Sequence, residues 1–350
     1  MEWITTNVII LSLSESQSCY GVVEIASNRL GQNEGVMRIL NSMYGQAFGD
    51  MLGEPLEGLT REQIKARWCT VTGFIRPPSI TDDTVMTHLV VRSVCEVRRT
   101  DRRHIAGVFL KNRALIPRMG PTTAHALSCF AEDLGFTPTA GTTDGAAMRA
   151  PAIAWLFPED RVIPETIEAS LATHGSDIAI AGACAISSAV SSAINGSGIE
   201  TIIKAGIDGA EYVSNDLAAQ IRESVMLASE RTLEDAIDRT GCGIETVEAV
   251  PAVFAVIARD HDFRRGVIAA ANLGGDADTI ASMVGAILGG MVPDKDSMPR
   301  DWIDACRNSA DDVETMIQES WRCISELRLM KHDRRMHQKS TTPSLTAPFL

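Results

Sequence analysis

The chain has 350 residues and a formal net charge of −13, from 32 Lys and Arg residues against 45 Asp and Glu residues. Broad electrostatic binding to nucleic acid or to an anionic membrane needs clustered basic residues, so this balance argues against both partners. Aromatic residues make up only 5% of the chain, too few for the stacking surfaces of single-strand binders. The length allows one large domain or two, and either can fold without disulfides or a structural metal.

The eight cysteines are scattered along the chain, with no C-x-x-C pair. We therefore expect free thiols, mostly buried, and no disulfide framework. No apolar run reaches the length of about 18 residues that a membrane-spanning helix needs. A short apolar patch at residues 8–13 follows Glu2 and lacks the basic region of a signal peptide. Together these features predict a cytoplasmic protein.

The chain divides into three parts by its pattern of apolar residues. Residues 1–36 are rich in Ser and Asn, which predicts a poorly ordered N-terminal extension; a structured strand is the alternative. Residues 331–350 are basic and then rich in Ser, Thr and Pro, which predicts a disordered tail. Residues 37–330 predict one large all-α domain, because apolar residues recur at helical spacing without βαβ alternation. The predicted helices are residues 37–48, 83–97, 177–194, 247–258, 266–272 and 279–291.

Two short acidic clusters each precede an apolar helix: ITDDT at residues 80–84 and GGDADT at residues 274–279. Asp and Thr at a helix start can cap free backbone N–H groups, which explains one acid well and two neighbouring acids less well. The alternative is a metal site, because carboxylate and hydroxyl oxygens are the ligands that Mg²⁺, Mn²⁺ or Ca²⁺ select. An EF-hand is excluded, since Ile287 stands at the twelfth loop position, where that motif needs Glu. The residues alone leave both interpretations open.

Two further segments are less specific. In GQAFGDMLGEPLE (45–57), small residues recur every four positions, which predicts a helix face for close packing against another helix. Glu54, after that face, is expected to be a solvated loop charge. In GTTDGAAMR (141–149), a Gly/Thr loop opens an apolar helix. Such a loop can offer backbone N–H groups to a phosphate, and it can equally be a plain helix start.

Together and in this order, the motifs resemble those of the ADP-ribosylglycohydrolase family. The resemblance covers most of residues 37–292, through the segments GQAFGDMLGEPLEG (45–58), TDDTVM (81–86), GPTT (120–123), TDGAAMR (143–149), THGSDIAIAGA (173–183) and NLGGDADTIASMVGAILG (272–289). It implies an all-α fold, a single large orthogonal helical domain of that family's type. It also implies a glycosidase-type hydrolase with a binuclear metal centre in a central cleft.

By this resemblance, the two acidic clusters bind two Mg²⁺ ions, with Mn²⁺ as an alternative. The implied metal ligands are Thr81, Asp82, Asp83, Asp276, Asp278 and Thr279. Four carboxylates in one cleft would repel one another strongly without such cations, which favours metal binding over capping alone. Glu57 matches a family glutamate seven residues after the aspartate of the Gly-Asp pair, and is the candidate for assisting proton transfer.

The resemblance also implies a set of substrate-binding residues. They are Asp50, Thr143, Asp144, Gly145, Ala146, Met148, Arg149 and His174. Arg149 can alternatively form a buried structural ion pair, and a lone histidine such as His174 is more often structural. Asp144 departs from the family pattern, which has Asn or Gly there, and its charge is unfavourable beside a pyrophosphate.

Three functions follow. The first is a Mg²⁺-dependent hydrolase that cleaves the ribosyl glycosidic bond of ADP-ribosylated protein or of a small ADP-ribose conjugate. The second is an N-glycosidase of a nucleoside or related ribosyl metabolite, in which Asp144 is easier to accommodate. The third is a non-catalytic ADP-ribose-binding relative, which is disfavoured because all six ligand-type residues are present.

Overall fold

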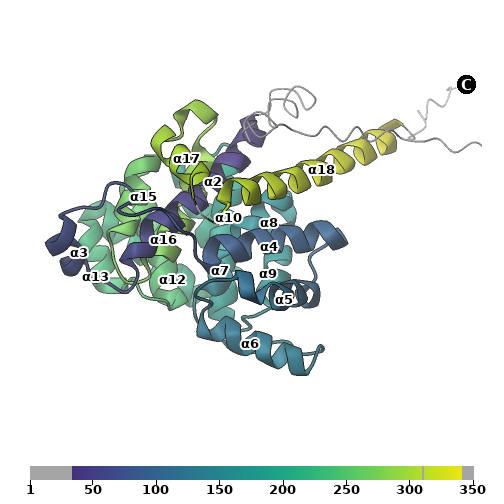
Figure 1. Cartoon of the computed structure of the whole chain (residues 1–350), viewed down its shortest axis with the longest axis horizontal. Helices are drawn as coiled ribbons and strands as arrows, with labels where there is room; N and C mark the ends of the chain where they lie inside the picture. Colours follow the sequence, from purple (N-terminus) through teal and green to yellow (C-terminus); the bar gives the residue numbers. More distant parts are fainter. Residues whose placement is uncertain (1–33, 310, 341–350) are drawn as a thin grey trace, which may run out of the picture.

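The computed structural model describes residues 34–309 and 311–340, and these residues form helices joined by turns and loops (Figure 1). Within this part, the only β-type pairings are two isolated antiparallel bridges, Thr60 with Gly274 and Thr143 with Glu245. The all-α prediction is confirmed. Most of the predicted N-terminal extension, up to residue 33, lies outside the described residues.

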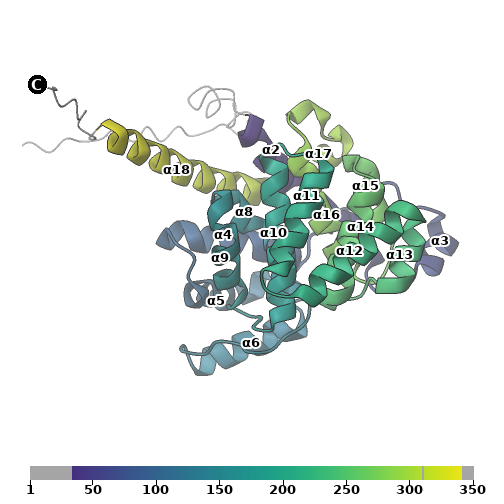
Figure 2. The same cartoon turned by 180° about the vertical axis from the view of Figure 1, so that it is seen from behind.

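The described residues form both α-helices and short 3-10 helices, the latter labelled η. In chain order they are α2 (Glu34–Gly53), η1 (Glu54–Leu56), α3 (Arg61–Trp68), α4 (Asp82–Val97), α5 (Arg102–Lys111), η2 (Arg113–Leu115), α6 (Pro121–Glu132), α7 (Gly145–Met148), α8 (Pro151–Leu156), α9 (Glu159–Ser170), α10 (Asp177–Ile194), α11 (Ile199–Glu211), α12 (Asn215–Glu230), α13 (Leu233–Thr240), α14 (Thr246–Arg259), α15 (Phe263–Ala271), α16 (Ala277–Met291), η3 (Lys295–Ser297), α17 (Arg300–Arg307) and α18 (Val313–Ser340). Figure 2 shows the same bundle from behind, with α10, α11, α12 and α14 in front.

The helices α2 and α16 pack against each other backbone to backbone. A Cβ atom added at Gly45 would lie 2.1 Å from the carbonyl oxygen of Gly285, and one added at Gly49 would lie 2.0 Å from that of Ala281. Side chains larger than hydrogen therefore do not fit at these two positions. The predicted face of small residues is confirmed, and it joins the two segments that carry the Gly-Asp motif and the second acidic cluster.

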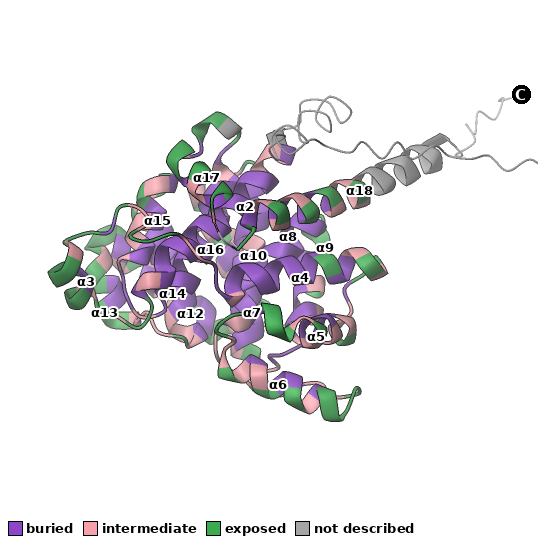
Figure 3. Ribbon diagram, viewed as in Figure 1, coloured by how far each residue is buried: buried purple, intermediate pink, exposed green. Residues whose placement is uncertain are grey.

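Helix α10 lies inside the bundle, where it packs against α7, α8, α9, α11, α14 and α16 (Figure 3). By length and composition it is the one helix of residues 34–309 and 311–340 that could span a membrane, so the expectation that no apolar run is long enough is wrong. The reason is that its Ser and Gly residues interrupt the apolar run only weakly. In the fold, 83% of this 18-residue window is buried, as in the core helix of a globular domain.

All six predicted helices are present, and several are longer than their apolar pattern. Helix α2 continues to Gly53, although glycine inside a helix lowers its stability. A Cβ atom at Gly53 would lie 2.4 Å from the carbonyl oxygen of Ala277, so contact with α16 explains both the glycine and the extra turn. At the other end of the chain, α18 reaches Ser340, beyond the predicted domain boundary at residue 330. Residues 341–350 of the predicted tail lie outside the described residues.

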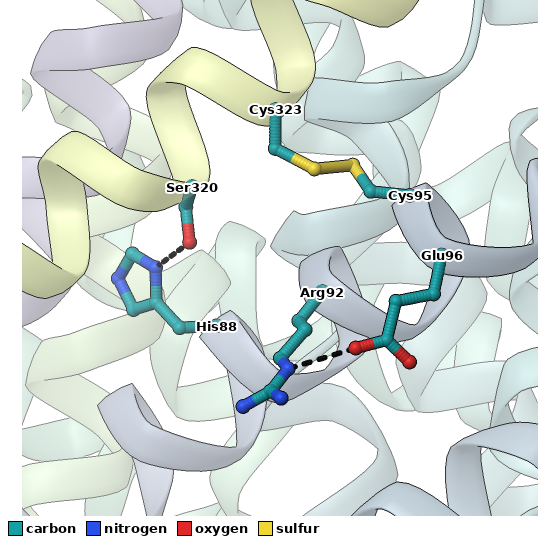
Figure 4. The surroundings of a disulfide bond; sticks show 6 residues. All are labelled: His88, Arg92, Cys95, Glu96, Ser320 and Cys323. Carbon is teal, nitrogen blue, oxygen red and sulfur yellow. Dashed lines mark hydrogen bonds and ion pairs between the residues drawn. A yellow bond between two sulfur atoms is a disulfide. The ribbon is translucent and has the colours of Figure 1, made fainter.

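The packing of α18 against α4 corrects the expectation that the cysteines are free. Cys95 on α4 and Cys323 on α18 form a disulfide, with Cα atoms 6.2 Å apart although 228 residues separate them in the chain (Figure 4). Sequence spacing contains no signal for this pair, because only the tertiary contact between the two helices brings the residues together. The cysteines that are both free and buried, as expected, are Cys184 and Cys306.

Candidate active site

The two acidic clusters, 193 residues apart in the sequence, meet where the N-termini of α4 and α16 converge. The Thr81 and Thr279 hydroxyls both donate to the same oxygen of Asp83, at 3.0 and 3.2 Å. Thr81 also caps α4, since its hydroxyl accepts from the backbone N–H of Asp83 at 3.2 Å. At the start of α16, Asp276 makes no capping hydrogen bond. Capping therefore explains the threonine of the first cluster and leaves the carboxylate of Asp276 unexplained.

The second cluster is held in place by its Gly-Gly turn. Gly274 and Gly275 have φ values of 74° and 65°, a region that favours glycine. A Cβ atom at Gly275 would lie 2.0 Å from the carbonyl oxygen of Cys242, and that same carbonyl accepts from the Asp276 N–H at 2.7 Å. The Gly275 N–H donates to the Leu59 carbonyl at 2.8 Å. The turn therefore locks the second cluster against the loop that follows Glu57.

Asp50 supports the first cluster from behind. Its side chain is fully buried and accepts from the backbone N–H groups of Thr81 and Thr84, at 3.0 and 3.2 Å, and from the Thr84 hydroxyl at 2.5 Å. Burial raises its pKa to about 6, and these hydrogen bonds only partly offset the effect. The resemblance implied substrate contact for Asp50, whereas its hydrogen bonds here go to the helix start.

The two clusters together form one acidic centre, which consists of Thr81, Asp82, Asp83, Asp276, Asp278 and Thr279. Its carboxylates act on one another electrostatically. Burial raises the pKa of Asp82 to about 7, with the charges of Asp50 and Asp276 adding to the shift. Burial also raises the pKa values of Asp83 and Asp278 well above the ordinary range, and each is raised further by neighbouring carboxylates. One oxygen of Asp83 and one of Asp278 are buried without a hydrogen-bond partner. Such oxygens are costly unless a cation faces them.

The donor chemistry of this centre suits a hard divalent cation, because all the side chains offer oxygen. Within the described ranges, however, no three or more His, Cys, Asp or Glu side chains already converge closely enough to hold an ion. Holding one would require the carboxylates to turn toward it. One oxygen of Asp83 and one of Asp278 have no hydrogen-bond partner, while the other Asp83 oxygen is held by the Thr81 and Thr279 hydroxyls.

On another side of the centre, the Gly/Thr loop meets His174. The Thr143 hydroxyl is hydrogen-bonded to His174 Nε2 at 2.9 Å and donates to the Thr122 hydroxyl at 3.0 Å. The other ring nitrogen of His174 is 2.8 Å from the Thr173 hydroxyl. Burial, and then the nearby charge of Arg149, lower the pKa of His174 well below its ordinary value. His174 is therefore a neutral, fully hydrogen-bonded imidazole that fixes the loop.

Asp144, in the same loop, joins the acidic centre. Its backbone N–H donates to the Ile244 carbonyl at 3.0 Å, and its side chain is 5% exposed. Burial raises its pKa well above the ordinary range, followed by the charge of Asp276 and a hydrogen bond with that carboxyl group. One of its oxygens has no partner. The departure from the family pattern thus adds another buried carboxylate to the centre.

The rest of the loop is built into the core. Ala146 and Met148 are buried, and a Cβ atom at Gly145 would lie 2.9 Å from the His174 ring. Arg149 is 2% exposed, donates to the Gly145 carbonyl, and stacks 5.5 Å from the Phe109 ring centroid.

Arg149 also donates to the Thr173 hydroxyl. In the part of the chain described, it has no carboxylate at ion-pair distance, so the alternative of a buried structural ion pair is wrong; its partners are neutral. Burial lowers its pKa to about 9, and the charge of Asp82 opposes this shift.

Glu57 lies at the exposed edge of the centre, 40% exposed, and accepts from Arg118 Nη1 at 2.6 Å. Glu54 is 6% exposed and is paired with both Arg76 and Arg118, so its interpretation as a solvated loop charge is wrong. The two arginines follow it in the chain by 22 and 64 residues and are brought to it by the fold. Arg118 was not predicted as a site residue. Its position two residues before the GPTT motif is the one sequence signal that could have indicated it.

A cavity of about 940 Å³ lies beside the acidic centre, between α4, the segment before α6 and the first turns of α18. It shares Glu54, Ile80 and Arg118 with the edge of the centre, but none of the predicted metal ligands lines it. Two of its lining residues are His88 and Ser320, whose Nδ1 and hydroxyl oxygen are 2.6 Å apart (Figure 4). This cavity and the acidic centre are therefore neighbours and not the same place.

Comparison with known proteins agrees with this architecture. The family model for ADP-ribosylglycohydrolase matches residues 33–334. The chain is 30% identical to YegU of Escherichia coli K12, over 73% of this chain and 87% of YegU. It is 27% identical both to ADP-ribosylhydrolase ARH3 of Xenopus tropicalis (77% of this chain, 90% of ARH3) and to ADP-ribosylarginine hydrolase Tri1 of Serratia proteamaculans (78% and 76%).

A solved structure, described as an ADP-ribosylglycohydrolase-related protein complex, has the same fold, with a TM-score of 0.66 at 24% identity. The likeness covers 83% of this chain and 99% of that one. The fold and the family match define a glycosidase-type hydrolase. The chain belongs to the ADP-ribosylglycohydrolase family.

Proposed function

We propose that the protein hydrolyses the bond between the anomeric carbon of a ribose and its acceptor, in ADP-ribosylated protein or in a small ADP-ribose conjugate. The observation that supports this is the meeting of the two acidic clusters, in which Thr81 and Thr279 donate to the same oxygen of Asp83. The names of the relatives ARH3 and Tri1 support the substrate class.

The acidic centre is proposed to hold two Mg²⁺ ions, with Mn²⁺ as the alternative. The ligands would be Thr81, Asp82, Asp83, Asp276, Asp278 and Thr279. When bound, the ions would neutralise the carboxylates and supply Lewis acidity toward the ribose hydroxyls and a water molecule. The unpartnered buried oxygens of Asp83 and Asp278 support this assignment.

The chain's own residues would orient the sugar and move the proton. Fixed carboxylates favour the positive charge of an oxocarbenium-like transition state at the anomeric carbon. Glu57, half-exposed beside the centre, is the candidate to exchange a proton with the attacking water or the leaving group. The neutral imidazole of His174 would keep the Thr143 hydroxyl of the Gly/Thr loop in place.

A second function is favoured by one observation, the buried carboxyl group of Asp144. Among the side chains that the structure describes, no basic group forms an ion pair with this carboxyl group, which lies beside Asp276. In its ionised form Asp144 would repel a pyrophosphate placed next to it, whereas it would not repel an uncharged nucleoside. Hydrolysis of a nucleoside or related ribosyl metabolite is therefore the second candidate.

A substrate panel tests both functions. The pure protein with Mg²⁺ is incubated with ADP-ribosyl-arginine, with protein ADP-ribosylated on serine, and with nucleosides, and the released sugar is measured. Release of ADP-ribose is expected, and release from nucleosides alone would replace the first function with the second. Tight ADP-ribose binding without any release would indicate a non-catalytic relative. Full activity after verified metal removal would overturn the metal assignment.

A further inference from the structure

Arg118 joins two glutamates at the edge of the acidic centre. Its Nη1 donates to Glu57 at 2.6 Å and approaches the Glu54 backbone carbonyl at 3.4 Å, while its Nη2 donates to the Glu54 carboxylate. The planar guanidinium group bridges two carboxylates in a fixed geometry, whereas a lysine ammonium is a compact charge on a flexible stem and holds them less firmly.

The two ends of this bridge differ in burial. Glu54 is 6% exposed and has a second partner in Arg76, so its carboxylate is fixed by two cations. Glu57 is 40% exposed, and Arg118 is its only ion-pair partner in the described chain. Glu54 is therefore an anchor for Arg118, and Arg118 in turn is what restrains Glu57.

Glu57 needs such a restraint because of its neighbours. Its charge acts on Asp278, as do the charges of Asp83 and Asp276, so the centre repels the Glu57 carboxylate. The positive charge of Arg118 lies within reach of both Glu57 and Asp278 and offsets this repulsion. Without Arg118, a half-exposed side chain beside buried like charges is expected to swing toward solvent.

The backbone around Arg118 is itself tied to the centre. Arg118 has a φ of 50°, which is uncommon for a residue other than glycine. Two residues later, the Gly120 backbone hydrogen-bonds to the Asp82 side chain, and α6 begins at Pro121. The segment therefore contacts the first acidic cluster through its backbone and Glu57 through the Arg118 side chain.

We infer that Arg118 is a positioning residue: anchored on buried Glu54, its guanidinium group holds the Glu57 carboxylate beside Asp278. The inference deepens the proposed function and rests on it, because it gives Glu57 the position from which it exchanges a proton. The other role open to an exposed arginine near this site is direct binding of a substrate phosphate. Both ends of the Arg118 guanidinium are already engaged by carboxylates, which disfavours that role.

The test compares Arg118→Gln with the matched variant Arg76→Gln. Both arginines bind the Glu54 carboxylate and are about half exposed, but only Arg118 reaches Glu57. In either variant Glu54 keeps one cation, so folding is expected to survive. Crystal structures should show the Glu57 carboxylate displaced from the side of Asp278 in Arg118→Gln and unmoved in Arg76→Gln. An unmoved Glu57 in Arg118→Gln would overturn the inference.

Kinetics on the best substrate of the panel gives the second readout. Since general acid–base assistance contributes about 10²–10⁴-fold, Arg118→Gln should lower kcat by about 10–100-fold with KM changed less than about threefold. Arg76→Gln should stay within about threefold of the wild-type protein, and Arg118→Lys should restore part of the loss. In a Glu57→Gln background, Arg118→Gln should cause no further loss, because the group that it positions is already gone.

The outcomes separate the inference from the proposed function. A rise in KM at constant kcat, or an undiminished loss in the Glu57→Gln background, would assign Arg118 to substrate binding and overturn the inference. Wild-type turnover by Glu57→Gln would remove the proton-transfer role and with it the catalytic consequence of positioning. If the wild-type protein hydrolyses nothing in the panel, the proposed function fails, and the crystal structures alone decide whether Arg118 positions Glu57.

Discussion

Along the middle of α2 and α16, two backbones touch through glycine and alanine, with a Cβ atom at Gly285 placed only 2.0 Å from the Gly45 carbonyl oxygen. Where the same two helices meet at the end of α2 and the start of α16, near Gly53 and Ala277, the pair reaches the acidic centre. There the contacts are between buried carboxylates that raise one another's pKa values, such as Asp278 with its neighbours. The first region is neutral and close-packed, and the second is charged and incompletely hydrogen-bonded.

The difference suggests how the fold can hold a repulsive cluster. Carboxylates that repel one another would separate if their supports could move, and a close-packed pair of backbones resists such movement. The glycine contacts therefore keep the start of α16 against the end of α2, where Asp50 hydrogen-bonds the start of α4. The close-packed middle of α2 and α16 therefore stabilises the fold, while the repulsion between carboxylates is confined to the acidic centre.

The largest expected effect comes from breaking the neutral region. Gly49→Leu places a side chain where a Cβ atom already lies 2.0 Å from the Ala281 carbonyl oxygen, so the two helices must separate. We expect a loss of at least ~3 kcal/mol in the free energy of unfolding, measured by urea denaturation. The matched control is Gly107→Ala in α5, where a Cβ atom has nothing within 4 Å. That change should stabilise the protein by about 0.5–1 kcal/mol, and wild-type stability of Gly49→Leu would contradict the role of the contact.

The next effect comes from the charged region. Asp278→Asn should lower turnover by at least ~100-fold, because one of the proposed ligands of the ions is lost. The same change should leave the thermal midpoint of the metal-free protein unchanged or higher, since one of several repelling carboxylates is removed. Asp216→Asn, on the exposed start of α12, is the control and should alter neither quantity. Unfolding of Asp278→Asn would show instead that the charged region supports the fold.

Removing the metal tests the role of the acidic centre without a mutation. Chelation should abolish turnover and lower the thermal midpoint, and Mg²⁺ or Mn²⁺ should restore both. An ion present at 100 times its Kd stabilises a protein by about 2.7 kcal/mol, which calorimetry can detect. In Asp278→Asn the ion-induced shift should shrink. A shift of the same size in that variant would place the ions away from the acidic centre.

The close-packed region could be predicted from the sequence more fully than the acidic centre. Periodic apolar residues predicted the buried helices, including the α2 face built on Gly45 and Gly49, because close packing depends on local spacing. The two acidic clusters could be matched to each other only through the family resemblance. Their contact at Asp83 depends on where α4 and α16 end up in space.

The pattern of residues along the chain could not predict which distant residues would contact each other. Nothing in the spacing of Cys95 and Cys323 predicts that α18 lies across α4. In the same way, the sequence around Glu54 predicts a solvated loop charge. In the structure, the fold brings Arg76 and Arg118 to it from 22 and 64 residues away. Such pairs depend on tertiary contacts, which a single sequence does not encode as a local signal.

The smallest expected effect concerns Asp144, the buried acid that connects the Gly/Thr loop to the acidic centre. In Asp144→Asn the new amide can donate to Asp276, so the metal-free protein should gain about 1 kcal/mol in the free energy of unfolding. Removing the charge should also raise turnover of an ADP-ribosyl substrate relative to a nucleoside by about tenfold, equivalent to ~1.4 kcal/mol. The measurements are urea denaturation in chelator and the ratio of kcat/KM values.

Asp177→Asn is the matched control, because Asp177 is an exposed acid in the first turn of α10. It should change neither the stability gain nor the substrate ratio. If Asp144→Asn leaves the ratio unchanged but weakens Mg²⁺ binding, the carboxylate contributes to the ions and does not select the substrate. If the ratio moves toward the nucleoside, the repulsion between Asp144 and a pyrophosphate is not what decides the specificity of this site.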